Sequence, residues 1–266
     1  MDISHWKERL NKLPIGELHL FSEVGSTNQE AEKLIHAGAE PFSLVVADSQ
    51  TAGKGRQGRT WITRPGQALA FSWILYPEKG RIQPELLGRI NGLGSLAIAE
   101  TLQENYGLES EIKWPNDLLI GDKKAAGILV EVHWNGCQLL DVILGIGINV
   151  GLKAIPPDNQ FDFPATSLEA ISKREINRLD LLESVLDSLL KWYRRLAEPG
   201  LISAWNDRLA YKNQLVSLTS PKGSLTEGRV LGVEEDGALT LEIGGSEKRQ
   251  YHSGEIQMRL VDRSRK

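Results

Sequence analysis

Short apolar or alternating segments recur along the chain at the lengths typical of β-strands. Residues 17–24 alternate between apolar and polar side chains, as a half-buried strand does. Residues 43–48, 67–75, 127–134 and 138–150 are rich in β-branched and other apolar side chains. Several of these runs are apolar on both faces, which predicts a sheet that is covered on at least part of both sides.

Two longer segments carry apolar residues at helical spacing. Residues 84–107 predict a helix that ends at Gly107, and residues 178–200 predict a second one that stops at the Pro-Gly pair closing this range. A shorter helix is predicted to begin at an N-cap formed by Ser26 or Thr27. Strands and helices together place the first part of the chain in the α/β (α+β) class.

The pattern changes near residue 212. From there the chain has short alternating segments separated by turn residues, and the Asp236-Gly237 pair is a strong hairpin signal. We therefore predict two modules, a mixed α/β domain over residues 1–211 and a small β-barrel over residues 212–266.

Composition narrows the class of protein. The chain has 266 residues, 41% of them hydrophobic, and carries 31 Lys+Arg against 35 Asp+Glu for a net charge of −4. It lacks an apolar run of about 18 residues and an N-terminal signal pattern, which predicts a cytoplasmic protein with no membrane partner. The single cysteine, Cys137, excludes an intramolecular disulfide and any multi-cysteine metal site. The acidic balance argues against a nucleic-acid binder.

A basic, glycine-rich segment stands out against this acidic background. The sequence TAGKGRQGRTW, residues 51–61, contains three glycines and no acidic residue. Its glycines let backbone N–H groups converge on one point, and Lys54, Arg56 and Arg59 add cationic donors. The expected occupant is a phosphate or a carboxylate; the alternative is a solvated surface loop. Trp61 offers a plane that suits either a bound ring or the core.

A second polar concentration is KWPNDLLIGDKKAAGILVE, residues 113–131. Its proline takes no part in a ladder, so Asn116 and Asp117 are expected at a strand end. Asp117 is a candidate for Mg²⁺ beside a phosphate, or else the carboxylate of an Asx-turn. Lys124 is a cation at a strand entrance, or simply a solvated lysine.

The third concentration is LGIGINVG, residues 144–151. Glycines at positions 145 and 147 let another group pack directly on the strand backbone, and Asn149 follows at the strand end. A ligand or a close strand-to-helix contact explains these glycines equally well.

The segments STN (26–28), QTAGKGRQGRTW (50–61), KWPNDL (113–118), KKAAGILVE (123–131) and GIGINV (145–150), taken in this order, resemble the biotin protein ligase family. The resemblance implies a mixed sheet flanked by helices, similar to class II aminoacyl-tRNA synthetases, followed by a small C-terminal SH3-like β-barrel. Such enzymes use Mg·ATP to convert biotin to biotinyl-5′-AMP. They then transfer biotin to a lysine of a biotin carboxyl carrier protein of acetyl-CoA carboxylase or a related carboxylase.

The same resemblance assigns roles to individual residues, with Lys124 and Arg56 as the catalytic cations. The expected biotin-binding residues are Ser26, Thr27, Asn28, Gln50, Lys54, Gly55, Arg56, Lys124, Gly127, Leu129, Gly145 and Gly147. The expected ATP-binding residues are Arg56, Arg59, Trp61, Asn116, Asp117, Lys124 and Asn149. Asp117 is also expected to contact Mg²⁺, although most of the metal's ligands would come from the phosphates.

Two features depart from the family's common pattern. Position 54 is lysine where the family usually has arginine, so a contact that needs a guanidinium there is in doubt. Only 25 residues precede Ser26, too few for a winged-helix domain, which predicts a ligase without specific DNA binding. A lipoate ligase of the same fold and a non-catalytic binding module remain alternatives, and the sequence is compatible with a monomer or a homodimer.

Overall fold

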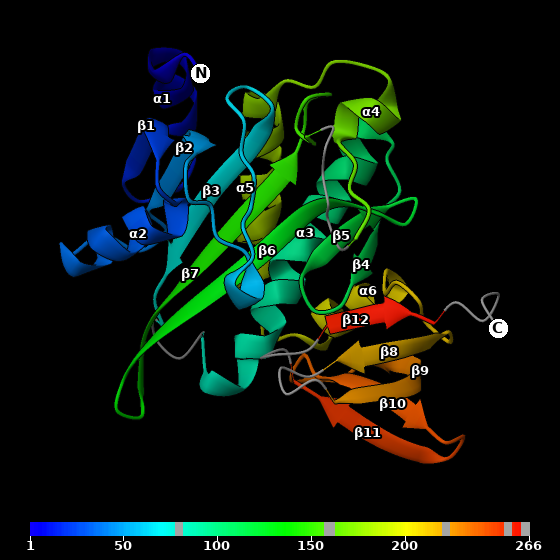
Figure 1. Cartoon of the computed structure of the whole chain (residues 1–266). Helices are drawn as coiled ribbons and strands as arrows, with labels where there is room; N and C mark the ends of the chain where they lie inside the picture. Colours follow the sequence, from blue (N-terminus) through cyan, green and yellow to red (C-terminus); the bar gives the residue numbers. More distant parts are fainter. Residues whose placement is uncertain (78–81, 157–162, 220–223, 253–256, 262–266) are drawn as a thin grey trace.

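The computed structural model describes residues 1–77, 82–156, 163–219, 224–252 and 257–261. Its first part is built on a seven-stranded sheet in the order β1-β2-β3-β7-β6-β5-β4 (Figure 1). β1 and β2 pair in parallel and the other neighbours pair antiparallel, so the sheet is mixed. Its strands are β1 (Leu18–Val24), β2 (Leu44–Gln50), β3 (Ala68–Leu75), β4 (Glu111–Lys113), β5 (Asp117–Ile120), β6 (Lys123–Asn135) and β7 (Gln138–Asn149).

The five strands predicted from apolar patterning correspond to β1, β2, β3, β6 and β7. Every residue of β3 is buried, as expected for a central strand covered on both faces. The sequence prediction missed β4 and β5, which have only 3 and 4 residues. Strands this short show too few alternations to be recognised from the sequence alone.

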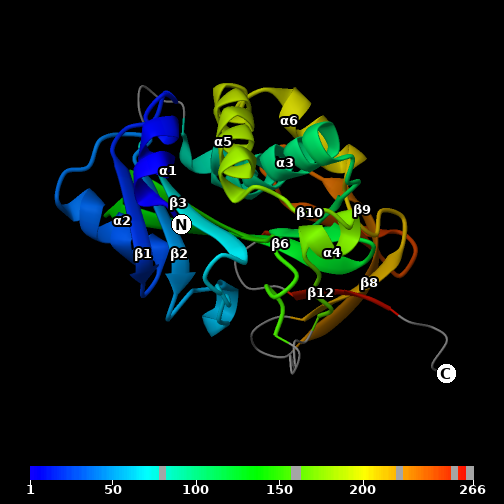
Figure 2. The ribbon, with the colours of Figure 1, turned by 90° about the horizontal axis from the view of Figure 1, so that it is seen from above.

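Helices cover both faces of this sheet. α2 (Thr27–His36) buries Ala31 against Val45, Ile74 and Ile143 on one face. Two long helices, α3 (Leu87–Tyr106) and α5 (Arg178–Arg194), pack on the opposite face and form the main core with the sheet. The shorter α6 (Pro199–Asp207) lies beside them, as Figure 2 shows. Shorter helices are α1 (Ile3–Leu10), α4 (Leu168–Ser172) and the 3-10 turns η1 (Arg56–Gly58) and η3 (Pro84–Leu86).

The predicted helix ends were partly wrong. Gly107 does end α3 in the left-handed conformation, with φ 64°. α5, however, ends at Arg194, and Pro199 opens α6 because a proline at the first helical position gives up no intrahelical hydrogen bond. Ser26 occupies the N-cap position of α2, but its side chain makes no capping hydrogen bond.

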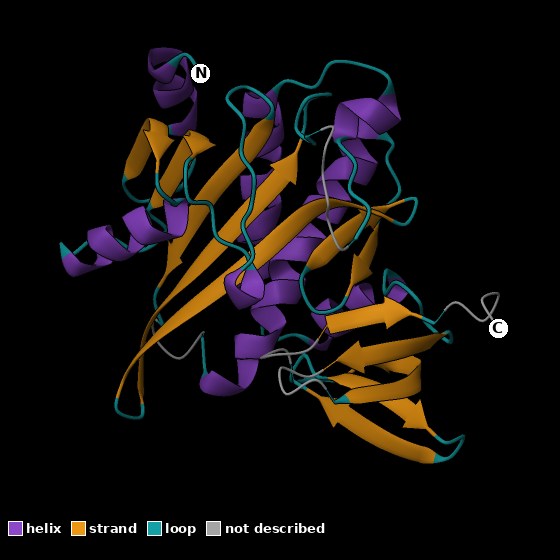
Figure 3. Cartoon of the chain, viewed as in Figure 1, coloured by secondary structure: helices purple, strands orange, loops and turns teal. Residues whose placement is uncertain are grey.

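The second part of the chain is a five-stranded antiparallel sheet in the order β11-β10-β9-β8-β12. Figure 3 shows its strands in orange beside the larger sheet. Among the described residues β11 and β12 remain its two edges, so the predicted barrel is not closed. The Asp236-Gly237 pair forms the turn between β9 and β10, as predicted, although residues 253–256 of the last predicted segment lie outside the described ones. The strands are β8 (Leu215–Thr219), β9 (Leu225–Val233), β10 (Leu239–Ile243), β11 (Glu247–Tyr251) and β12 (Gln257–Leu260).

The turn between β9 and β10 docks against the start of α3. A Cβ at Gly88 would lie 2.1 Å from the Asp236 carbonyl oxygen, so the two backbones touch. The Trp114 indole nitrogen donates to the Gly237 carbonyl at 3.0 Å, and this links the second sheet to the strand that leads into Asp117. Of the helices described, none has the length and apolar character to cross a membrane.

Candidate functional site

Two adjoining cavities lie where the basic segment 51–61 crosses the ends of β5, β6 and β7. The larger has a volume of about 430 Å³ and the smaller of about 50 Å³. The two cavities share a wall. The residues common to both are Gly55, Arg56, Trp61, Asn116 and Lys124.

The smaller cavity brings together every residue predicted to bind biotin. They come from segments far apart in the sequence: the start of α2, the end of β2, the basic segment and the strands β6 and β7. The lining residues from the predicted set are Ser26, Thr27, Asn28, Gln50, Lys54, Gly55, Arg56, Lys124, Gly127, Leu129, Gly145 and Gly147. β6 and β7 contribute because their register pairs Gly127 with Gly147 and Leu129 with Gly145.

A chain of hydrogen bonds holds the polar end of the smaller cavity. Gln50 Oε1 accepts from the Thr27 backbone N–H at 2.8 Å. The Asn28 amide donates through Nδ2 to Glu131 Oε2 at 2.6 Å, and its Oδ1 accepts from Ser72 Oγ at 2.5 Å. Asn28 and Ser72 are both buried, so the bond between them is shielded from water. These hydrogen bonds are formed within the protein alone, so the polar cluster is already connected without a ligand.

The glycines of β7 make room for two side chains. A Cβ at Gly145 would lie 2.2 Å from Asn28 Oδ1, and a Cβ at Gly147 would lie 2.4 Å from Trp61 Cε2. Gly145 thus allows a helix side chain to approach the strand, and Gly147 receives the indole of the basic segment. Both glycines are required by close packing inside the site.

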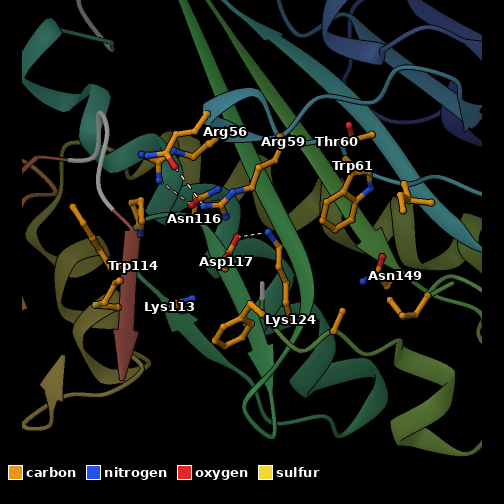
Figure 4. Close-up of a pocket in the computed structure, with 18 of the residues that line it drawn as sticks. Arg56, Arg59, Thr60, Trp61, Lys113, Trp114, Asn116, Asp117, Lys124 and Asn149 are labelled. Carbon is orange, nitrogen blue, oxygen red and sulfur yellow. Dashed lines mark hydrogen bonds and ion pairs between the residues drawn. The ribbon is translucent and has the colours of Figure 1, made fainter. Parts of the chain in front are cut away.

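The larger cavity collects every residue predicted to bind ATP (Figure 4). The predicted residues that line it are Arg56, Arg59, Trp61, Asn116, Asp117, Lys124 and Asn149. Arg56 Nη1 donates to Asn116 Oδ1 at 3.0 Å, and Asn116 Nδ2 donates to the Ile128 carbonyl at 2.7 Å, which anchors this arginine to β6. Burial lowers the pKa of the Arg56 guanidinium. An anion beside Arg56 would stabilise the charged guanidinium and so offset the unfavourable free energy of its desolvation.

Lys124 lies at the boundary between the cavities. Its Nζ is 2.6 Å from Asp117 Oδ1 and 5.4 Å from the ring centroid of Trp61. Lys124 is on β6 and Asp117 begins β5, and these neighbouring strands bring the two charges together. The predictions of a strand entrance for Lys124 and a strand end for Asp117 are both correct.

The comparisons with known proteins agree with this arrangement. Residues 20–149 match the Biotin/lipoate A/B protein ligase family, and residues 213–259 match the Biotin protein ligase C terminal domain. The Bifunctional ligase/repressor BirA of Bacillus subtilis is 30% identical over 250 residues, which cover 92% of this chain and 75% of that protein. The chain belongs to the biotin protein ligase family.

Solved structures support the same assignment. The biotin protein ligase from Aquifex aeolicus in complex with biotin and ATP is 27% identical, with a TM-score of 0.79 over 92% of this chain and 99% of that chain. The Biotin--[acetyl-CoA-carboxylase] ligase of Paracoccus denitrificans is 28% identical over 84% of this chain and 92% of that protein. The mixed sheet with flanking helices, predicted for a biotin protein ligase, is thereby confirmed.

Several residues that line the larger cavity were not predicted as site residues. Lys113 is 8% exposed, and its Nζ lies 3.7 Å from the ring centroid of Phe163. Burial lowers the pKa of Lys113 to about 8. Met258 and Arg259 reach the larger cavity from β12. Lys113 is the first residue of the KWPND segment and could have been noticed there. Nothing in the local sequence of β12 indicates that this strand lies close to a site more than 100 positions earlier.

Proposed function

We propose that the chain activates biotin with ATP to form biotinyl-5′-AMP and then transfers biotin to a lysine of a biotin carboxyl carrier protein. The observation that carries this proposal is the shared wall of the two cavities. One cavity gathers the residues expected for biotin, the other gathers those expected for the nucleotide, and Arg56, Asn116 and Lys124 belong to both. A carboxylate at the end of the first would therefore meet an α-phosphate at the edge of the second.

The cations of this wall address the main difficulty of the first step. A carboxylate and a triphosphate repel each other, and charge accumulates on the phosphate as the carboxylate oxygen attacks. Lys124 neutralises this charge in our proposal, and the half-buried Arg56 holds the two anions together. Both nucleophiles come from substrates, the biotin carboxylate first and the carrier lysine second, so no enzyme side chain needs to form a covalent bond.

The metal expected with ATP fits this site only in part. Within the described residues no group of three or more His, Cys, Asp or Glu side chains is arranged to hold a metal ion. Asp117 supplies one carboxylate at the cavity wall. A single carboxylate suits Mg²⁺ that is bound mainly by phosphates, where it would stabilise the negative charge of the leaving pyrophosphate.

The names of the relatives favour biotin over lipoate as the acyl substrate. The Paracoccus denitrificans relative is a Biotin--[acetyl-CoA-carboxylase] ligase, and the Aquifex aeolicus structure contains biotin and ATP. By this similarity the acceptor is the carrier protein of acetyl-CoA carboxylase or a related carboxylase, and we expect the reaction to take place in the cytoplasm. The polar cluster of Asn28, Thr27 and Gln50 suits a ureido ring, which has both hydrogen-bond donors and an acceptor.

Exchange of labelled pyrophosphate into ATP tests the first step. We expect exchange with biotin and none with lipoate, and a loss of about 100-fold or more in Lys124→Met because a transition-state charge loses its partner. Lys33→Met is the matched control, since Lys33 lies on the exposed side of α2 and pairs only locally with Glu30. Folded protein that exchanges with lipoate, or with neither acid, would exclude the proposed function.

A further inference from the structure

Glu131, a residue of β6 outside the predicted site, holds both the polar cluster and the basic segment. Its Oε2 accepts from Asn28 Nδ2 at 2.6 Å, and its Oε1 lies 3.7 Å from Lys54 Nζ. The side chain is 34% exposed, so it stays in contact with water. One carboxylate thus links α2, where Asn28 lies, to the segment that crosses over the cavity.

Glu131 decides which way the Asn28 amide is oriented. An ionised carboxylate can only accept hydrogen bonds, so the amide nitrogen must face Glu131 and the amide oxygen must face Ser72. The reverse orientation would place two acceptor oxygens about 2.6 Å apart, which is strongly repulsive. The Asn28 side chain has no room to turn away from Glu131, because the Gly145 backbone lies directly against its amide.

The orientation of Asn28 then sets the direction of its neighbours. Ser72 has one hydroxyl hydrogen and gives it to Asn28 Oδ1. The hydroxyl oxygens of Ser72 and Thr27 are 2.8 Å apart, and the Thr27 hydroxyl also contacts Gln50 Oε1 at 3.2 Å, so the network continues from Asn28 to Gln50. Glu131 Oε2 receives one of the two Asn28 amide hydrogens, which leaves the second N–H as a donor toward a ligand.

We propose that Glu131 is a positioning residue for biotin: it orients the Asn28 amide so that the pocket presents an N–H donor to the ureido carbonyl. This inference rests on the proposed function, because it takes biotin as the ligand. It also accounts for lysine at position 54, since a single ammonium suffices to contact one oxygen of Glu131 and no guanidinium fork is needed.

Steady-state pyrophosphate exchange of Glu131→Gln tests the proposal. A glutamine side chain can donate to or accept from Asn28, so the amide loses its fixed orientation. We expect the KM for biotin to rise up to about tenfold, the size expected for one lost hydrogen bond between neutral groups, while kcat and the KM for ATP change less than about twofold. The control is Glu242→Gln, because Glu242 is 31% exposed and pairs with Arg229 at 3.6 Å on the second sheet. No kinetic parameter should change in that variant.

The route through Asn28 is tested in an Asn28→Ala background. If Glu131 acts by orienting Asn28, adding Glu131→Gln to Asn28→Ala should raise the KM for biotin less than about twofold. An unchanged KM for biotin in Glu131→Gln, a full tenfold effect that persists without Asn28, or a parallel rise in the KM for ATP would each overturn the proposal. Lack of exchange in the wild-type protein would instead overturn the proposed function itself, so the two failures are distinguishable.

Discussion

The substitution Gly145→Ala should push the Asn28 side chain away from β7 and break two hydrogen bonds of the polar cluster. The new Cβ would lie 2.2 Å from Asn28 Oδ1, whereas an ordinary contact begins at 3.4 Å, so the amide must retreat by about 1.2 Å. Gly145 itself cannot shift, because it is paired in register with Ser72 on β3 and with Leu129 on β6. The retreat breaks the bonds from Ser72 and to Glu131, which measure 2.5 and 2.6 Å.

The magnitude follows from these two bonds. A neutral buried hydrogen bond contributes about 1 kcal/mol and one to a charged group about 1.5–3 kcal/mol, so their loss costs roughly 2.5–4 kcal/mol. Replacing glycine by alanine restricts the unfolded chain and returns about 0.5–1 kcal/mol. We expect urea denaturation to show a net decrease of roughly 1.5–3.5 kcal/mol in the free energy of unfolding, with a KM for biotin raised at least about tenfold.

The control and the refuting result use nearby positions. A Cβ at Gly25 would contact only Gln29 Oε1, at 3.4 Å, so Gly25→Ala should leave both quantities close to the wild-type values. In an Asn28→Ala background the clashing atoms are absent, and Gly145→Ala should then cost less than about 1 kcal/mol. An equal cost in both backgrounds would refute the assignment of the clash to Asn28.

Three further predictions concern the larger cavity and its wall. Gly147→Ala places a Cβ 2.4 Å from Trp61 Cε2, and the displaced indole should lower kcat/KM for biotin at least about tenfold in the exchange assay. Burial lowers the pKa of Lys113 to about 8, so its charge is lost as the pH rises from about 7 to about 9. The KM for ATP should therefore rise severalfold over that interval, and Lys113→Arg should flatten the profile; a wild-type profile that is already flat contradicts this role. Arg56→Gly should release biotinyl-5′-AMP and biotinylate unrelated lysines, detectable by avidin blotting, whereas unchanged carrier specificity would argue against a sealing role for Arg56.

The elements that could be predicted are those whose own residues carry the signal. β3 and β7 were recognised because strands that are largely buried on both faces are mostly apolar, and α3 because its apolar stripe runs to a left-handed Gly107. The end of α5 was misplaced because the Pro-Gly pair that was expected to stop it opens α6 instead. A proline disfavours a helix interior and favours a helix start, and the local sequence does not distinguish these two positions.

The sequence by itself determined which chemical groups are available for a binding site: the cations and glycines of residues 51–61, the amide and carboxylate of the KWPND segment, and the glycines of β7. These groups can be recognised from residue types and short spacings, and both can be read from a local stretch of sequence. Only the tertiary structure decided which groups meet. The contact between Glu131 and Asn28 joins residues 103 positions apart, and Arg259 reaches the larger cavity from the far end of the chain. Such contacts depend on strand order and register, and the packing of the whole core fixes both.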